Sequence, residues 1–232
     1  MEQNLSKKTR TESDLIGSRE VPESALYGVQ TLRGIENFRI SKFHLNEYPL
    51  FIQALAITKM GAAVANRELD LLTEEQADAI LKACKEILEG KHHDQFPVDM
   101  IQGGAGTTTN MNANEVIANR ALELMGHQRG EYQYCSPNDH VNRSQSTNDA
   151  YPTAIHIGLY YTHLKLVKHF EVLIESFRKK ATEFAHVIKM GRTQLEDAVP
   201  MTLGQTFNGF ASILRHEVKN LDFAAQDFLT VN

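Results

Sequence analysis

The sequence predicts an all-α protein, with an N-terminal helical domain over residues 1–140 and the first long helices of a central helical bundle over residues 141–232. Two observations support this fold class. Apolar residues recur at gaps of three, four or seven across two long segments, which places them on one face of a helix. No segment alternates apolar and polar residues between hairpin turns, so we expect little sheet.

Composition narrows the class of protein. The chain has 232 residues, 42% of them hydrophobic, which is enough to bury a core. Its 24 Lys and Arg against 29 Asp and Glu give a formal charge of −5, so we expect no nucleic-acid or membrane partner. Residues 1–14 are polar, and no stretch approaches the roughly 18 apolar residues that span a bilayer. Cys84 and Cys135 lie far apart without a CxxC pattern, which favours the cytoplasm.

The first helix with clear boundaries is expected after Thr73. Thr73 and Gln76 have the spacing of a capping box, in which each side chain binds a backbone N–H at the helix start. Apolar residues follow at helical spacing, and Gly90 stands where a glycine commonly ends a helix. Because Cys84 falls on the apolar face of this helix, we expect it to be buried and unreactive.

Two longer helices are expected in the second half, one from near Asp149 to near Ile188 and another from near Leu203 to the end. The first helix would be on the order of 50 Å long, and a helix of that length needs partner helices to bury its apolar face. A turn between the two makes them an antiparallel pair. The second pattern still continues at Asn232, so we expect a truncated chain.

A glycine-rich segment, 103–110, runs into three threonines before a helical stretch from Val116 to Met125. Glycines allow the backbone to approach a ligand, and N–H groups at a helix start favour anions. A phosphate loop is a poor match because no Gly-Lys-Ser/Thr follows and no strand precedes it. A loop with a helix cap and a carboxylate-binding site fit this segment about equally well.

Two further polar segments are 144–149, just before Pro152, and 191–200, between the two long helices. One or two residues of the first are explained as helix caps, but six polar residues in a row are more than a cap requires. Clustered hydroxyl and amide donors at a helix N-terminus would bind a carboxylate without a buried cation. The second segment is longer than a tight turn needs, but taken alone an ordinary surface loop explains it better than a binding site does.

Metal chemistry has no support in the sequence. The ten histidines include no HExxH pattern and no Cys/His set at zinc spacing. We therefore expect no structural metal and no cofactor.

Together the three polar segments resemble the signature segments of the aspartase/fumarase superfamily, over nearly the whole chain from about Asp14. The resemblance continues in the runs Asp14–Gly17, Val21–Pro22, Ala25–Gly28, Asn37–Phe38, Thr109–Ala121 and Val141–Ala154. Fumarases carry a histidine where this chain has Gln194, and another where it has Ser136. The resemblance is therefore to the aspartase branch of the superfamily.

This resemblance implies an ammonia-lyase that converts L-aspartate to fumarate and ammonium through an aci-carboxylate intermediate. It also implies a homotetramer with a core of twenty helices, in which each site draws on three subunits. The implied substrate-binding residues are Thr107, Ser146, Thr147, Asn148, Thr193 and Gln194. Gln194 can orient a substrate but cannot shuttle a proton, because it has no imidazole.

The family's base is a serine on a flexible Gly-Ser-Ser loop, and no Ser-Ser pair occurs in these 232 residues. The resemblance thus implies that this chain contains substrate-binding residues but no catalytic base, and that the chain alone is inactive. Two other functions remain open: a fumarase-type hydro-lyase, and a non-catalytic helical assembly protein on the same scaffold. Tests of the full-length protein with L-aspartate and with L-malate separate the ammonia-lyase from the fumarase-type hydro-lyase. A full-length sequence without the serine loop would indicate the assembly protein.

Overall fold

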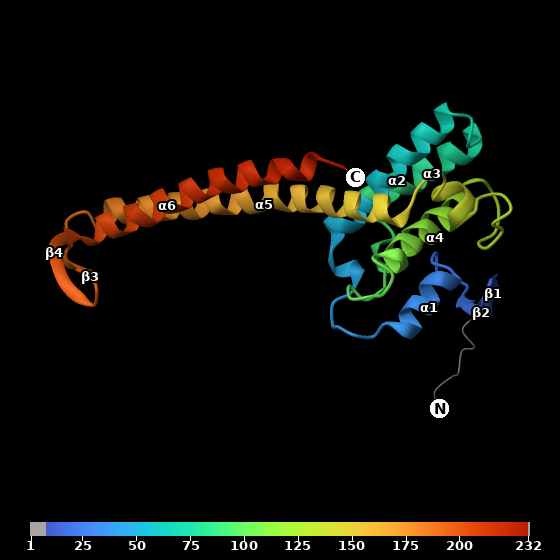
Figure 1. The fold of residues 1–232 in the computed structure, drawn as a ribbon, viewed down its shortest axis with the longest axis horizontal. Helices are drawn as coiled ribbons and strands as arrows, with labels where there is room; N and C mark the ends of the chain where they lie inside the picture. The colour runs from blue at the N-terminus through green and yellow to red at the C-terminus, as the bar shows by residue number, and fades with distance from the viewer. Residues whose placement is uncertain (1–7, 232) are drawn as a thin grey trace. The chain divides into compact units, whose positions relative to one another are not determined.

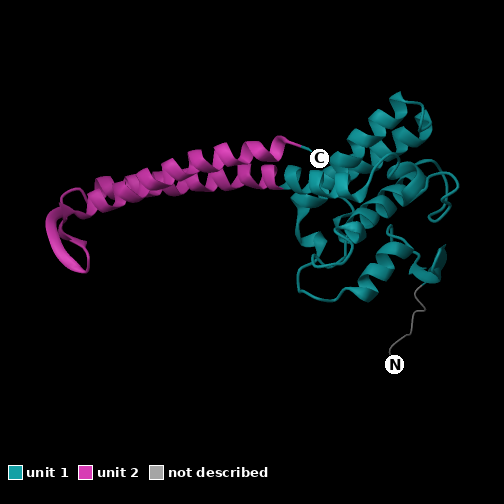
Figure 2. Cartoon of the chain, viewed as in Figure 1, with its two compact units in different colours: residues 1–158, 231–232 teal, residues 159–230 magenta. Residues whose placement is uncertain are grey.

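The computed structural model describes residues 8–231 (Figure 1). Residues 1–7 of the polar N-terminal segment lie outside the described residues. The chain divides into two compact units, residues 1–158 with 231–232, and residues 159–230 (Figure 2). The predicted division between residues 140 and 141 stays a prediction.

The first unit is built from helices and one short hairpin (Figure 1). Strands β1 (Thr9–Asp14) and β2 (Gly17–Pro22) pair antiparallel, and they are followed by α1 (Val29–Asn37), α2 (Pro49–Glu68), α3 (Glu74–Leu88) and α4 (Thr107–Leu124). Short 3-10 turns lie at Leu45–Glu47 and His93–Gln95, and a π-helical turn lies at Pro137–Val141. Helix α3 packs against both α2 and α4, and α1 packs against α4.

The predicted start and end of α3 are confirmed. Thr73 Oγ1 accepts a hydrogen bond from Gln76 N at 3.2 Å, and Gln76 Oε1 accepts one from Thr73 N at 3.2 Å. Gly90 follows the helix with φ +87°, the left-handed conformation that a glycine adopts at little cost. Cys84 is fully buried, as expected from its place on the apolar face.

Two carboxylates organise the start of α1. The carboxylate of Glu115, buried on α4, accepts hydrogen bonds from the backbone N–H groups of Gly28 and Thr31. Glu12 accepts one from Val29 N, and the hydroxyl of Tyr132 donates to Glu12. These bonds satisfy N–H groups that a helix start otherwise leaves unpaired.

We expect Gly28→Ala to destabilise the chain by about 2 kcal/mol or more, since overpacking a filled site forces its neighbours apart. A Cβ at Gly28 would lie 2.5 Å from Glu12 Oε2 and 2.7 Å from the Tyr132 hydroxyl. Gly61 is the matched control, because it lies exposed in α2 with open space around it. Gly61→Ala should stabilise by about 0.5–1 kcal/mol. Urea unfolding measures both, and equal effects would contradict the packing argument.

The second unit contains the remainder of a long helix and its antiparallel partner (Figure 2). The elements are α5 (Thr147–Glu183), which begins in the first unit, β3 (Ile188–Thr193), β4 (Glu196–Thr202), α6 (Leu203–Ala224) and a 3-10 turn (Ala225–Leu229). Both long helices are confirmed, although each ends several residues earlier than expected. The connection between them is an antiparallel hairpin with a β-bulge between Met190 and Arg192.

Ring and ion-pair contacts confirm that α5 and α6 are antiparallel. The ring of Phe184, one residue after the end of α5, lies 5.7 Å from the Phe207 ring near the start of α6. Toward the other end of the pair, His163 Nε2 lies 2.9 Å from Asp222 Oδ1. The predicted all-α class is therefore confirmed for residues 8–231, with two small hairpins added. In this part of the chain, no helix is both long and apolar enough to cross a membrane.

We expect the chain by itself to associate, because large apolar side chains of the second unit face solvent. Val172 is 67% exposed, Ile213 61% and Phe223 83%. Apolar surface of this kind usually marks an interface. Sedimentation should show assemblies that depend on concentration, and a monomer that binds no apolar dye would contradict this prediction. Phe223→Glu should weaken the association.

Candidate functional site

The predicted substrate residues Ser146, Thr147 and Asn148 form the start of α5. The hydroxyl of Ser146, which precedes the helix, accepts a hydrogen bond from Asn148 N at 3.2 Å. In return Asp149 Oδ2 accepts one from Ser146 N at 3.2 Å. Ser146 therefore caps the helix, and Asn148 is not needed for that purpose. Pro152, inside α5, has no N–H to donate to the carbonyl of Asn148.

Thr147 is tied to the first turn of α4. Its hydroxyl oxygen accepts a hydrogen bond from Asn110 Nδ2 at 3.2 Å. A hydroxyl that accepts such a bond keeps its own proton to donate to a ligand. Because the start of a helix also carries partial positive charge, this turn suits a carboxylate.

The glycine-rich segment is shorter than predicted, since α4 begins at Thr107 rather than near Val116. Thr107 is exposed, and its hydroxyl donates to Gly104 O at 2.5 Å. Gly106 has φ +89°, and a Cβ there would overlap the ring of Tyr151. Position 106 therefore requires a glycine. The absence of a side chain there lets the start of α4 lie close to the start of α5.

Thr193 and Gln194 belong to the second unit, at the tip of the β3-β4 hairpin. Thr193 pairs with Glu196, which leaves Gln194 and Leu195 as the two turn residues. Both have positive φ, 50° and 66°, a conformation that costs free energy in residues other than glycine. Both side chains are exposed. Positive φ at both central residues is what a two-residue hairpin turn of this type requires, so the site role of Gln194 stays a prediction.

The structure thus brings together two of the three predicted segments. Asn110 joins the first turn of α4, which contains Thr107, to the first turn of α5, which contains Ser146, Thr147 and Asn148. Thr193 and Gln194 are described with the second unit. The assignment of these six residues to a substrate stays a prediction.

Sequence reasoning missed a buried polar cluster beneath the start of α5. Lys59 of α2 is 0% exposed, and its Nζ donates to Asn142 Oδ1 and to Gln145 Oε1, both at 2.9 Å. Asn142 Oδ1 also accepts hydrogen bonds from the side-chain amides of Asn110 and Asn114, at 3.0 and 3.2 Å. A signal was present, because Lys59 follows Leu55 by four residues and so continues an apolar helical face.

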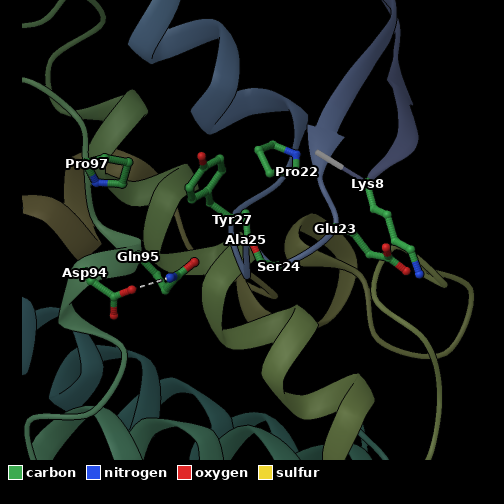
Figure 3. Close-up of a pocket in the computed structure, with 9 residues that line it drawn as sticks. All are labelled: Lys8, Pro22, Glu23, Ser24, Ala25, Tyr27, Asp94, Gln95 and Pro97. Atoms are coloured by element: carbon green, nitrogen blue, oxygen red, sulfur yellow. Dashed lines mark hydrogen bonds between the residues drawn. The ribbon is translucent and has the colours of Figure 1, made fainter. Parts of the chain in front are cut away.

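A surface cavity of about 700 Å³ lies elsewhere in the first unit (Figure 3). Figure 3 shows Tyr27, Ala25 and Pro22 along its wall, with Gln95 beside Asp94. Gln95 Nε2 donates to Asp94, and Gln95 Oε1 accepts from Leu26 N, so its amide is already bonded within the chain. None of the six predicted residues lines this cavity. Among the residues described, no group of three or more His, Cys, Asp or Glu side chains could hold a metal ion.

Residues 17–231 match the sequence model of a family described as Lyase, and the chain belongs to that family.

Among curated relatives, the aspartate ammonia-lyase of Escherichia coli (strain K12) is 56% identical over 98% of this chain and 48% of that protein. The aspartate ammonia-lyase of Helicobacter pylori (strain J99) is 57% identical over 91% of this chain and 45% of that protein. The chain therefore spans about half the length of the curated relatives that it matches.

Two solved structures have the same fold. A structure titled fumarate lyase:delta crystallin, from Brucella melitensis, has a TM-score of 0.94 and 51% identity over 97% of this chain and 52% of that one. Recombinant class II fumarase from Schistosoma mansoni has a TM-score of 0.87 and 36% identity, over 97% of this chain and 47% of that one. The resemblance to the aspartase/fumarase superfamily is thus confirmed.

Proposed function

We propose that this chain supplies substrate-binding residues to an ammonia-lyase that converts L-aspartate to fumarate and ammonium. The observation that carries the proposal is the identity of 56% to an aspartate ammonia-lyase over 229 residues, a region long enough to include all three polar segments. We further propose that the working enzyme is a homotetramer in the cytoplasm, with sites shared among subunits.

In the proposed reaction a base removes a proton from the carbon beside a carboxylate of L-aspartate. The electron pair left behind moves onto that carboxylate and gives an aci-carboxylate dianion. The pair then returns to form the carbon-carbon double bond as the C–N bond breaks and ammonia departs. The aci-carboxylate dianion needs hydrogen-bond donors already aimed at its carboxylate oxygens. Each such donor stabilises it by several kcal/mol.

The residues at the start of α5 fit that task. The hydroxyls of Ser146 and Thr147 each accept a hydrogen bond from the chain and keep a proton to donate. We assign them, with Thr107 and Asn148, to a substrate carboxylate. We assign Thr193 and Gln194 to the rest of the substrate, with Gln194 orienting it rather than transferring a proton.

A fumarase-type reaction fits less well. The fumarase structure shares 36% identity, against 56% for the aspartate ammonia-lyase. Gln194 also has no group that titrates, so it cannot relay a proton to or from a hydroxyl leaving group.

The test is a fusion in which this chain is followed by the portion of the Escherichia coli relative that lies beyond the matched half. The fusion should release fumarate, followed by its absorbance, from L-aspartate and not from L-malate. A folded tetrameric fusion that is inactive with L-aspartate, or that prefers L-malate, would overturn the proposal.

A further inference from the structure

We propose that Lys59 is a positioning residue for the proposed reaction. It anchors the 142–147 segment through buried hydrogen bonds, and it supplies the positive charge that favours a substrate carboxylate at the start of α5. This inference rests on the proposed function and extends it to a residue outside the six already assigned.

Three hydrogen bonds connect Lys59 to the candidate site through Asn142 and Asn110. Lys59 Nζ donates to Asn142 Oδ1, and Asn110 Nδ2 donates both to that same oxygen and to Thr147 Oγ1. Lys59 also donates to Gln145 Oε1, and Gln145 Nε2 in turn donates to Val141 O. A shift of the ammonium group would therefore move the hydroxyl assigned to the substrate.

The charge of Lys59 is not balanced by its bonding partners. Both of its acceptors are neutral amide oxygens. A fully buried ammonium without a paired carboxylate is costly, so lysines in protein interiors are usually ion-paired. The buried Oδ1 atoms of Asn110 and Asn114 accept no hydrogen bond from the described residues, which adds to the cost. A cluster that only filled the core would be more stable with apolar side chains.

An anion at the start of α5 would offset this cost. The turn already contains the carboxylate of Asp149, so a dicarboxylate needs a nearby positive charge to bind there. A charge in a dry interior acts over a longer distance than one at the surface, because water screens it less. Lys59 thus provides attraction without itself occupying the space for the substrate.

The charge of Lys59 can be varied through pH, because the groups around it do not change their own charge in the same range. Burial lowers the pKa of Lys59 to about 7 and raises the pKa of the Cys84 thiol of α3 to about 12, so Cys84 stays neutral. The hydrogen-bonding partners from α4 and from the 142–147 segment are neutral amides, and the side chain of Arg143 is exposed. His140 lies two residues before Asn142, and burial lowers its pKa from 6.5, so it titrates below the range of interest.

The experiment measures the affinity of the fusion protein for succinate, a dicarboxylate without the amino group, independently of turnover. Lys59→Met should weaken succinate binding by about tenfold or more. Above pH 7 the affinity of the unmodified fusion should fall as Lys59 loses its proton, and the variant should lack this fall. Lys59→Arg keeps the charge and should recover part of the affinity.

Asn66→Ala is the matched control for anchoring alone. Asn66, also on α2, donates through Nδ2 to Arg143 O at 2.8 Å and carries no charge. It should lower stability and change succinate affinity by less than about threefold. If Lys59→Met does not fold, Lys59→Gln is measured in its place, because the glutamine amide can still donate a hydrogen bond but carries no charge. Unchanged affinity in whichever uncharged variant folds, or an equal loss in Asn66→Ala, would overturn the proposal even with an active unmodified fusion.

Discussion

The 232-residue chain by itself is expected to release no measurable fumarate from L-aspartate, whereas the fusion with the remainder of the Escherichia coli relative is expected to be active. The chain spans 48% of that relative. By the family resemblance the base is a serine of a Gly-Ser-Ser loop, and no Ser-Ser pair occurs in the chain. Without a base the C–H bond is not broken, so donors alone cannot support turnover.

The expected difference is all or none, and it is measured by fumarate absorbance at equal protein concentration. A fusion whose appended half has its Gly-Ser-Ser loop changed to Gly-Ala-Ala is the control. It should fold and assemble like the active fusion but remain inactive. Turnover by the chain alone would show that a base lies within these residues and would contradict the proposed division of the site.

Helix boundaries were predictable where the local sequence determines them. Thr73 and Gln76 form the expected capping box, and Gly90 follows the helix with positive φ. The long α5 and α6 were predictable because their apolar period continues for many residues. Their ends were not, since Ile188 continues the apolar spacing but lies in β3 and is 81% exposed.

The two hairpins were missed for physical reasons. The β1-β2 hairpin is made largely of polar residues, and its turn depends on Asp14 Oδ1, which accepts hydrogen bonds from the backbone N–H groups of Ile16 and Gly17. The β3-β4 hairpin turns at Gln194 and Leu195, without the Asn-Gly or Asp-Gly pair that usually marks such turns. Neither hairpin alternates apolar and polar residues.

The candidate site was predictable only in part. The polar segments were visible in the sequence because they exceed what helix caps require, and the contact of Asn110 with Thr147 supports a shared role for two of them. The cluster around Lys59 depends on tertiary contacts between residues more than 80 positions apart. Spacing along the chain cannot reveal such contacts, although a lysine on an apolar helical face is a signal.

In the fusion protein, Asn148→Ala and Thr193→Ala are each expected to lower kcat by about 10²-fold or more, the usual effect of removing a donor to a developing oxyanion. KM should change less, because these donors act mainly on the dianion. Thr107→Ala should cost about tenfold, since its hydroxyl proton already binds Gly104 O. Thr182→Ala and Asn220→Ala, at exposed positions of the second unit, are matched controls that should leave kcat within about twofold.

Thermal unfolding of the same variants separates catalysis from folding. A role for Asn148 as the helix cap would predict a stability loss of about 1 kcal/mol with kcat nearly unchanged. The structure assigns the capping bond to Ser146, whose hydroxyl accepts from Asn148 N. An alanine at 148 keeps that backbone N–H, so Asn148→Ala should preserve the capping bond while kcat falls. Variants that lose stability but keep kcat would show that Asn148 and Thr193 serve the fold and not the substrate.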